Sequence, residues 1–376
     1  MIRLLGFLVV VLVFAKPAAG EELSSSEWHY GAVLDLSYAL DFNFPENHFW
    51  RNKTTSRRVN ELAPNVAVGY VRKEVSPASR WGMELGVQGG YDTETLVPAG
   101  GDRPVGSADT LRHFSRANVS YLAPVGNGLT LTAGLFNSYI GYQSFYAKNN
   151  LNYTRSYMDD NAPYFMFGVG AVYPLHDSLQ IGLYVLNGYN YLSRANDHPS
   201  YGTQVQWRPT ARLTVTENVY YGPDQSNTAI EFWRFFSDSI IEWKDGPLTL
   251  AAAYDIGTEN AAEHPAHPRT FWTGGALYAH WNVSGPWSIA LRPEFYWDRT
   301  GRISGSEQFV KALTTTLAYK WTHPWHTALL RLEYRYDEST GRNGGFFIQG
   351  ERAPGLPGLI REQHLLLCSV VWWFDR

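Results

Sequence analysis

The chain has 376 residues, and its 31 basic and 35 acidic residues give a formal net charge of −4. This balance argues against a nucleic-acid partner, which would need a basic face. Cys368 is the only cysteine, which excludes an internal disulfide framework. The chain is rich in aromatic residues and in glycine, with 14 Trp, 24 Tyr, 19 Phe and 34 Gly.

The N-terminus has the pattern of a secretory signal. Arg3 precedes an apolar run over 4–15, and small residues lead up to Gly20. The run is too short to span a bilayer as a helix. We therefore expect a signal peptide over 1–20 and a mature protein over 21–376; a buried core helix is the alternative. No later stretch is long and apolar enough for a membrane helix, so a membrane could be crossed only by strands of a closed barrel.

Apolar and polar residues alternate along the whole mature chain. This pattern predicts an all-β fold, a transmembrane antiparallel up-and-down β-barrel of about sixteen strands. An even number of strands would place both termini on the periplasmic side. The strands are expected near 28–44, 57–73, 79–92, 110–124, 127–137, 162–174, 177–187, 199–208, 211–221, 228–243, 246–256, 269–283, 286–298, 307–322, 325–337 and 361–374.

Short and long connections alternate between these strands. The short ones are rich in Gly, Pro, Asn and Asp, as in Asp245-Gly246-Pro247 and Ser284-Gly285-Pro286. The long ones are 45–56, 93–109, 138–161, 188–198, 222–227, 257–268, 299–306 and 338–360. Short periplasmic turns that alternate with longer outer loops are typical of outer-membrane barrels. A soluble sandwich has no need of this alternation.

Aromatic residues cluster at the short turns. They are Trp81, Tyr121, Tyr173, Trp207, Trp243, Trp281, Trp287, Trp321, Trp325, Trp372 and Trp373. Amphipathic rings settle at the headgroup boundary of a membrane, so this clustering predicts an aromatic girdle.

Charged residues of both signs lie on the polar faces of the strands. A barrel of sixteen strands encloses an aqueous channel, and charges along it would filter solutes by charge and size. The expected pore-lining residues are Asp35, Glu84, Arg112, Arg116, Arg292, Glu294, Arg331, Glu333 and Arg335. The alternative is that these residues pair and brace the wall.

The loop 138–161 is too aromatic for a solvated tip. We expect it to fold inward and to narrow the pore. The side chains expected at this constriction are Tyr142, Phe145, Tyr146, Lys148, Tyr153 and Arg155. The alternative is an outer loop that packs on its neighbours.

Two stretches resemble one known family. The segment from Gly31 to Asn47 is similar to the opening strand of the OmpL-like β-barrel porin-2 family. Gly134-Leu-Phe-Asn-Ser-Tyr-Ile-Gly141 and the segment Asn150 to Tyr157 resemble its central signature. The resemblance implies an outer-membrane barrel that acts as a porin, without catalytic residues and with undefined substrates. The chain departs from many barrels in that Asp375 and Arg376 follow its last aromatic residue.

We therefore predict a bacterial outer-membrane porin for passive diffusion of small hydrophilic solutes, surrounded by lipid and able to form a homotrimer. One alternative is a non-conducting structural or adhesive barrel. Another is a membrane-embedded lipid hydrolase, for which His113 and Ser115 have a suitable spacing, although Arg116 replaces the asparagine that commonly follows. His264 and His267 lack further convergent ligands, so no metal and no cofactor is expected.

Overall fold

The computed structural model describes residues 28–96, 111–189, 191–192, 196–225, 230–261 and 269–376. The expected signal peptide and the two histidines at 264 and 267 lie outside the described residues. None of the described helices has the length and apolar character that crossing a membrane as a helix requires.

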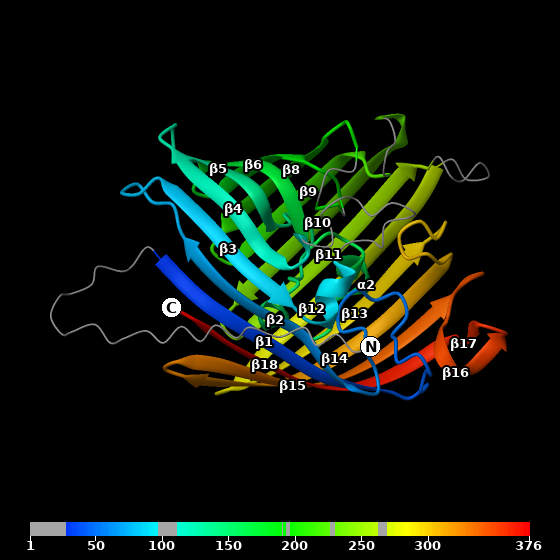
Figure 1. The fold of residues 1–376 in the computed structure, drawn as a ribbon. Helices are drawn as coiled ribbons and strands as arrows, with labels where there is room; N and C mark the ends of the chain where they lie inside the picture. The colour runs from blue at the N-terminus through cyan, green and yellow to red at the C-terminus, as the bar shows by residue number, and fades with distance from the viewer. Residues whose placement is uncertain (1–27, 97–110, 190, 193–195, 226–229, 262–268) are drawn as a thin grey trace, which may run out of the picture.

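Sixteen strands of the described residues form one closed antiparallel barrel (Figure 1). Each strand pairs with its neighbours in sequence, and β1 closes the ring by pairing with β18, with Tyr38 opposite Cys368. Closure leaves no unpaired strand edge. The barrel strands are β1 (Trp28–Asp41), β2 (Leu62–Lys73), β3 (Trp81–Gly89), β4 (Phe114–Ala123), β5 (Leu129–Asn137), β6 (Phe165–His176), β7 (Leu179–Leu186), β8 (Ser200–Thr210), β9 (Leu213–Pro223), β10 (Trp233–Asp245), β11 (Leu248–Asn260), β12 (Arg269–Ser284), β13 (Trp287–Asp298), β14 (Gln308–His323), β15 (His326–Thr340) and β18 (Glu362–Asp375).

The predicted fold class and strand number are confirmed, whereas several strand bounds differ from the prediction. The predicted strand 57–73 begins only at Leu62, because the backbone before it is irregular: Val59 donates to the carbonyl of His48 in the same loop, and Asn60 has a positive φ of 59°. The predicted loop 338–360 contains a separate hairpin of β16 (Phe346–Ala353) and β17 (Leu356–Ile360). This hairpin projects beyond the barrel (Figure 1).

The two faces of the barrel strands differ in burial as the alternation predicts. In β15, Leu330 and Leu332 are exposed on the outer surface, whereas Arg331, Glu333 and Arg335 are buried. Most of the aromatic side chains expected at the short turns are also exposed: Trp81, Tyr121, Trp207, Trp281, Trp287, Trp321 and Trp325. An apolar outer face with aromatic rings at one level suits a barrel immersed in lipid.

A charge on the outer face should therefore destabilise the barrel. We expect Leu332→Arg to lower the free energy of unfolding in lipid vesicles by about 2–4 kcal/mol, because the guanidinium would enter hydrocarbon. The matched control is Thr214→Arg in β9, a partly exposed lumen-side position opposite Glu242. Urea unfolding followed by tryptophan fluorescence would measure both. Equal destabilisation by the two variants would contradict this assignment of the faces.

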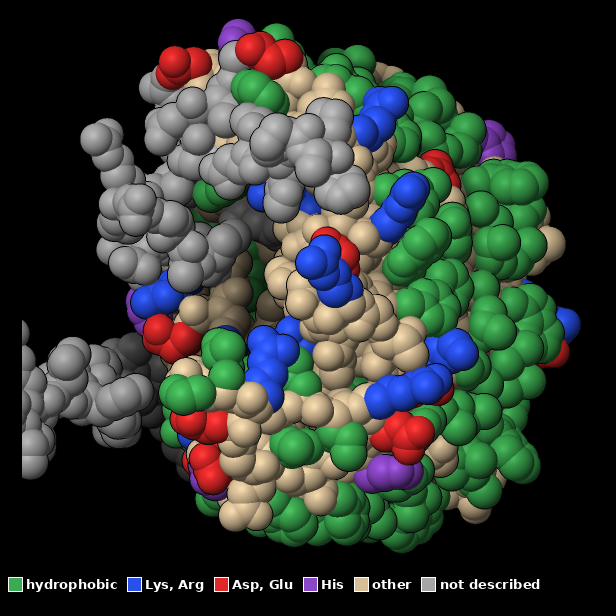
Figure 2. Space-filling model, turned by 90° about the vertical axis from the view of Figure 1, so that its right-hand side faces the viewer, with side chains coloured by type: hydrophobic (Ala, Val, Ile, Leu, Met, Phe, Trp, Pro, Cys, Tyr) green, Lys and Arg blue, Asp and Glu red, His purple; other side chains and the backbone are tan. Residues whose placement is uncertain are grey.

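The two ends of the barrel are unlike. The short turns and the C-terminus lie at one end, and the long connections lie at the other (Figure 1). Figure 2 views the end with the long connections, where polar and basic side chains cover much of the middle and hydrophobic side chains lie along the outer flank. Described segments that connect the strands thus cover part of the lumen from this end.

Candidate functional site

The connection between β5 and β6 crosses the lumen. We call residues 138–161 of this connection the inserted segment. In the closed barrel, β13 lies eight strands from β5 in either direction. The inserted segment reaches this opposite wall, where the backbone N–H of Tyr157 donates to Glu294 Oε2 on β13 at 2.6 Å. It therefore spans the full width of the barrel interior.

Glu333 on β15 is the main acceptor for the inserted segment. Its carboxylate oxygens accept the backbone N–H groups of Tyr153, at 2.7 Å, and Thr154, at 3.0 Å. Thr316 on the neighbouring strand donates its hydroxyl to the same carboxylate at 2.6 Å. Glu333 is fully buried. A buried charge with this many donors is satisfied, so the segment is attached at a fixed place.

Three arginines of the wall bind carbonyl groups of the inserted segment. Arg292 on β13 and Arg335 on β15 both donate to the carbonyl of Arg155, each at 3.2 Å. Arg331 donates to the carbonyls of Ala147, at 2.9 Å, and Asn150. Buried backbone carbonyls need hydrogen-bond donors, and these three side chains supply them.

The inserted segment is also attached to other parts of the wall. Tyr146 donates its hydroxyl to Gln88 on β3 at 2.8 Å. Tyr142 donates to Glu242 on β10 at 2.8 Å, and the backbone N–H of Gly141 donates to Asp238 on the same strand at 2.7 Å. The inserted segment is therefore attached to several sides of the barrel wall and is not a free loop.

Local interactions fix the shape of the inserted segment. Ser156 caps the short helix α2 (Tyr157–Asp160) by accepting the N–H of Asp159 at 3.1 Å. Gly141 has a φ of 93°, which a side chain would strain. Arg155 is fully buried and donates to the carbonyls of Phe145 and Tyr153. These residues hold the segment folded back on itself.

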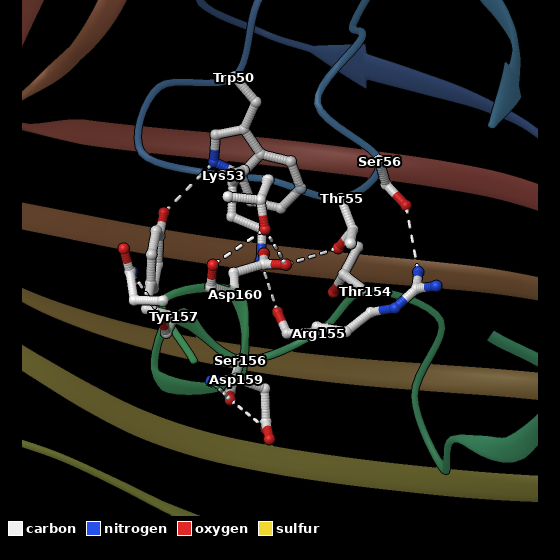
Figure 3. A network of polar contacts seen from close by, with 12 residues as sticks. Trp50, Lys53, Thr55, Ser56, Thr154, Arg155, Ser156, Tyr157, Asp159 and Asp160 are labelled. Carbon is white, nitrogen blue, oxygen red and sulfur yellow. Dashed lines mark hydrogen bonds and ion pairs between the residues drawn. The ribbon is translucent and has the colours of Figure 1, made fainter. Parts of the chain in front are cut away.

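A second connection packs on the first. We call residues 42–61, between β1 and β2, the first loop. Figure 3 shows that its side chains point toward the inserted segment. Lys53 forms a fully buried ion pair with Asp160 and donates to the carbonyl of Arg155 at 2.6 Å. Trp50 donates its indole N–H to the hydroxyl of Tyr157 at 3.3 Å.

Aromatic rings and carboxylates surround the cations of this network. The guanidinium of Arg335 lies 5.0 Å from the ring centre of Trp50 and 4.8 Å from that of Tyr157, within the range of cation–π attraction.

Burial opposes ionisation of Asp160, but Lys53 beside it brings its pKa below the usual value. Burial raises the pKa of Asp92 to about 8, although the charge of Arg155 opposes this shift.

The predicted pore-lining residues fall into three groups. Glu84 and Arg116 are partly exposed on the wall, with Arg116 Nη1 3.7 Å from Glu84 Oε1. Arg112 precedes β4 and pairs with Glu94 at 3.1 Å. The others are buried beneath the inserted segment and the first loop: Asp35, Arg292, Glu294, Arg331, Glu333 and Arg335. The side chains of this last group lie on the inner face of the barrel, where they contact protein instead of open water because the inserted segment covers them.

The predicted constriction residues also differ among themselves. Phe145, Tyr146, Tyr153 and Arg155 are buried, and their contacts stabilise the inserted segment. Tyr142 and Lys148 are only partly buried. Sequence reasoning missed the first loop, because its sequence carries no apolar pattern that would mark it as an inward segment.

Two cavities lined by described residues flank the inserted segment at the end with the short turns. One, of about 620 Å³, lies along β2 to β8 and contains Arg72, Lys73, Glu74 and Glu84; we call it the mixed cavity. The other, of about 540 Å³, lies along β12 to β15 and β18, and we call it the basic cavity. The segment thus separates two polar spaces within one lumen.

The residues of the hydrolase alternative do not form a catalytic pair. His113 is exposed, and its Nδ1 lies 3.4 Å from the carbonyl of Gln88. Ser115 Oγ is buried without a hydrogen-bond partner. A serine nucleophile needs a hydrogen-bonded base, so this geometry gives no support to hydrolysis at Ser115.

Comparison with known proteins agrees with this architecture. A family model described as "Putative beta-barrel porin-2, OmpL-like" matches residues 28–374. The chain belongs to this family. This porin has no significant match among curated proteins.

Solved structures show the same fold at low sequence identity. The outer-membrane channel DcaP of Acinetobacter baumannii has a TM-score of 0.61 and 11% identity, covering 93% of this chain and 99% of that one. OmpF of Salmonella typhi has a TM-score of 0.56 and 11% identity, covering 92% and 97%. A trimer form of Vibrio cholerae OmpT has a TM-score of 0.51 and 9% identity, covering 92% and 98%. The chain is a porin of the bacterial outer membrane.

Proposed function

We propose that this porin forms a water-filled channel for passive diffusion of small hydrophilic solutes, and that residues 138–161 set its narrowest point. The observation that carries the proposal is the path of the inserted segment from β5 to the opposite strand β13, where Tyr157 binds Glu294. A segment attached across the lumen leaves solutes only the space beside it. The mixed and basic cavities supply polar space on either side.

The proposal also covers the export of the chain, its location in lipid and its oligomeric state. We infer that residues 1–20 direct export and are removed, and that the barrel sits in outer-membrane lipid. A homotrimer is the proposed assembly; an outer-membrane protein of the same fold is described in a trimer form. The proposal assigns no catalytic step to the chain.

Planar-bilayer recording of the refolded protein tests this function. We expect discrete openings in KCl, with a conductance below that of an unobstructed barrel of sixteen strands, because the inserted segment and first loop occupy part of the lumen. A folded barrel that inserts but stays silent would contradict the proposal. It would favour the structural or adhesive barrel, for which the dense packing of the two loops in the lumen is the supporting observation.

A further inference from the structure

The basic cavity carries charge of one sign only. Its lining includes Lys148 of the inserted segment, Lys320 of β14 and Arg331 of β15, together with His280 of β12, and no acidic residue. The mixed cavity is different, since Arg72 and Lys73 share its lining with acidic residues. The inserted segment therefore separates two spaces of unlike electrostatic character.

Glu333 and Asp35 partly balance the charge of Arg331, but the two lysines of the basic cavity are different. Neither Lys148 nor Lys320 forms an ion pair within the described residues, and the ammonium of Lys148 lies over the ring of Trp373 at 5.8 Å. Asp375, the acid whose charge acts most on Lys148, is itself paired with Arg72 at 3.3 Å. Uncompensated positive charge in a confined polar space attracts anions.

Arg331 adds a fixed positive charge to the lining of the same cavity. It is 6% exposed, and its two terminal nitrogens hold carbonyls of the inserted segment. Its Nε, however, is buried without any hydrogen-bond partner. Because this nitrogen is enclosed, Arg331 acts on an anion in the cavity through its charge and not through a hydrogen bond from Nε.

The size and remaining lining of the cavity fit a small ligand. Its volume of about 540 Å³ would hold roughly 18 water molecules at about 30 Å³ each. Neutral hydrogen-bonding groups, among them Asn149, Asn282, Ser288 and Thr322, complete the lining. Burial lowers the pKa of Lys148, and a bound anion would favour its charged form.

We propose that the basic cavity is a binding subsite for small oxyanions, such as phosphate or a short carboxylate, on the periplasmic side of the inserted segment. This inference rests on the proposed channel function and deepens it. Solutes that pass beside β12 to β15 would meet Lys148, Lys320 and Arg331 together. Anions would therefore be concentrated there, whereas cations of similar size would be excluded from this side of the lumen.

Inorganic phosphate is the probe for the test, added to either side of a bilayer that contains single channels in KCl. We expect phosphate to reduce the current in a saturable manner, and choline at the same concentration to leave it unchanged. In the double variant Lys148→Gln/Lys320→Gln, the concentration for half-block should rise at least about tenfold. Arg331 is left intact, because its loss would release the inserted segment.

Lys244→Gln is the matched control, since Lys244 pairs with Glu242 at the same end of the barrel but outside the basic cavity. Its half-block concentration should equal that of the unmodified protein. Heat-dependent gel migration confirms that each variant is folded. The subsite would be overturned if the channel conducts but phosphate does not block it. It would also be overturned if phosphate blocks the double variant as well as the unmodified protein. Either result would leave the channel function intact.

If the folded barrel does not conduct, the channel function fails, and the subsite is tested by calorimetric titration of the detergent-solubilised protein with phosphate. Saturable binding that the double variant loses and Lys244→Gln retains would support the subsite. Absence of binding to the unmodified protein would overturn it.

Discussion

Replacing residues 143–157 by a short Gly-Ser linker is expected to raise the single-channel conductance at least about twofold, because the part of the inserted segment that crosses the lumen would be removed. The barrel itself should persist. The strands that the segment connects remain paired, with Asn137 of β5 opposite Phe165 of β6. The replaced stretch contributes hydrogen-bonding groups to the wall but no strand.

The replacement would also affect the first loop. Lys53 and Trp50 would lose the carbonyl of Arg155 and the hydroxyl of Tyr157 as partners, so the first loop should become more mobile. We therefore expect a higher conductance and, in addition, fluctuations of the channel current caused by motion of the first loop.

The control is a replacement of similar kind at the tip of the β16–β17 hairpin, residues 349–355, which is exposed and projects beyond the barrel (Figure 1). This variant should conduct like the unmodified protein. Unchanged conductance after replacement of 143–157 would show that the inserted segment does not set the narrowest point.

The wall of the barrel was predictable because its signal is local. Period-two alternation decides which side chains of β15 face inward, so Arg331, Glu333 and Arg335 were assigned to the lumen from neighbouring residues alone. Turn residues and aromatic clusters then fixed the strand number and the end at which the short turns lie.

The contacts between the inserted segment and this wall could not be predicted from a local pattern. Glu333 binds the inserted segment through the backbone N–H groups of Tyr153 and Thr154, some 180 positions earlier in the chain. Backbone groups are the same for every residue type except proline, so such a contact leaves no trace in residue identity. The aromatic content of 138–161 indicated an inward fold, but not which wall residues would be its partners.

The first loop shows a further limit. Its path depends on residues with positive φ, among them Asn52 and Ser56, which no periodic pattern describes. Its buried ion pair of Lys53 and Asp160 joins two connections, of which only 138–161 was expected to fold inward. A charged residue in a loop is usually solvated, and only the fold shows that these two are enclosed together.

Removing the carboxylate of Glu333 should release the inserted segment without changing its sequence. Glu333→Ala would leave the buried N–H groups of Tyr153 and Thr154 without acceptors, at a cost of about 1–3 kcal/mol for each. The amides of these two residues should therefore exchange with solvent deuterium at least about tenfold faster. Hydrogen-exchange mass spectrometry of peptides that cover 150–158 would measure this change.

The matched control is Glu338→Ala, which removes a carboxylate from the same strand. Glu338 pairs with the exposed Arg361 and does not contact the inserted segment, so exchange over 150–158 should stay slow. In bilayers, Glu333→Ala should give noisier openings of higher mean conductance, because a detached segment moves within the lumen, whereas Glu338→Ala should not. Fast exchange at Tyr153 and Thr154 in the unmodified protein would contradict the attachment. Slow exchange in Glu333→Ala would show that the carbonyl contacts of Arg292 and Arg335 suffice to hold the segment, and that Glu333 is not its main anchor.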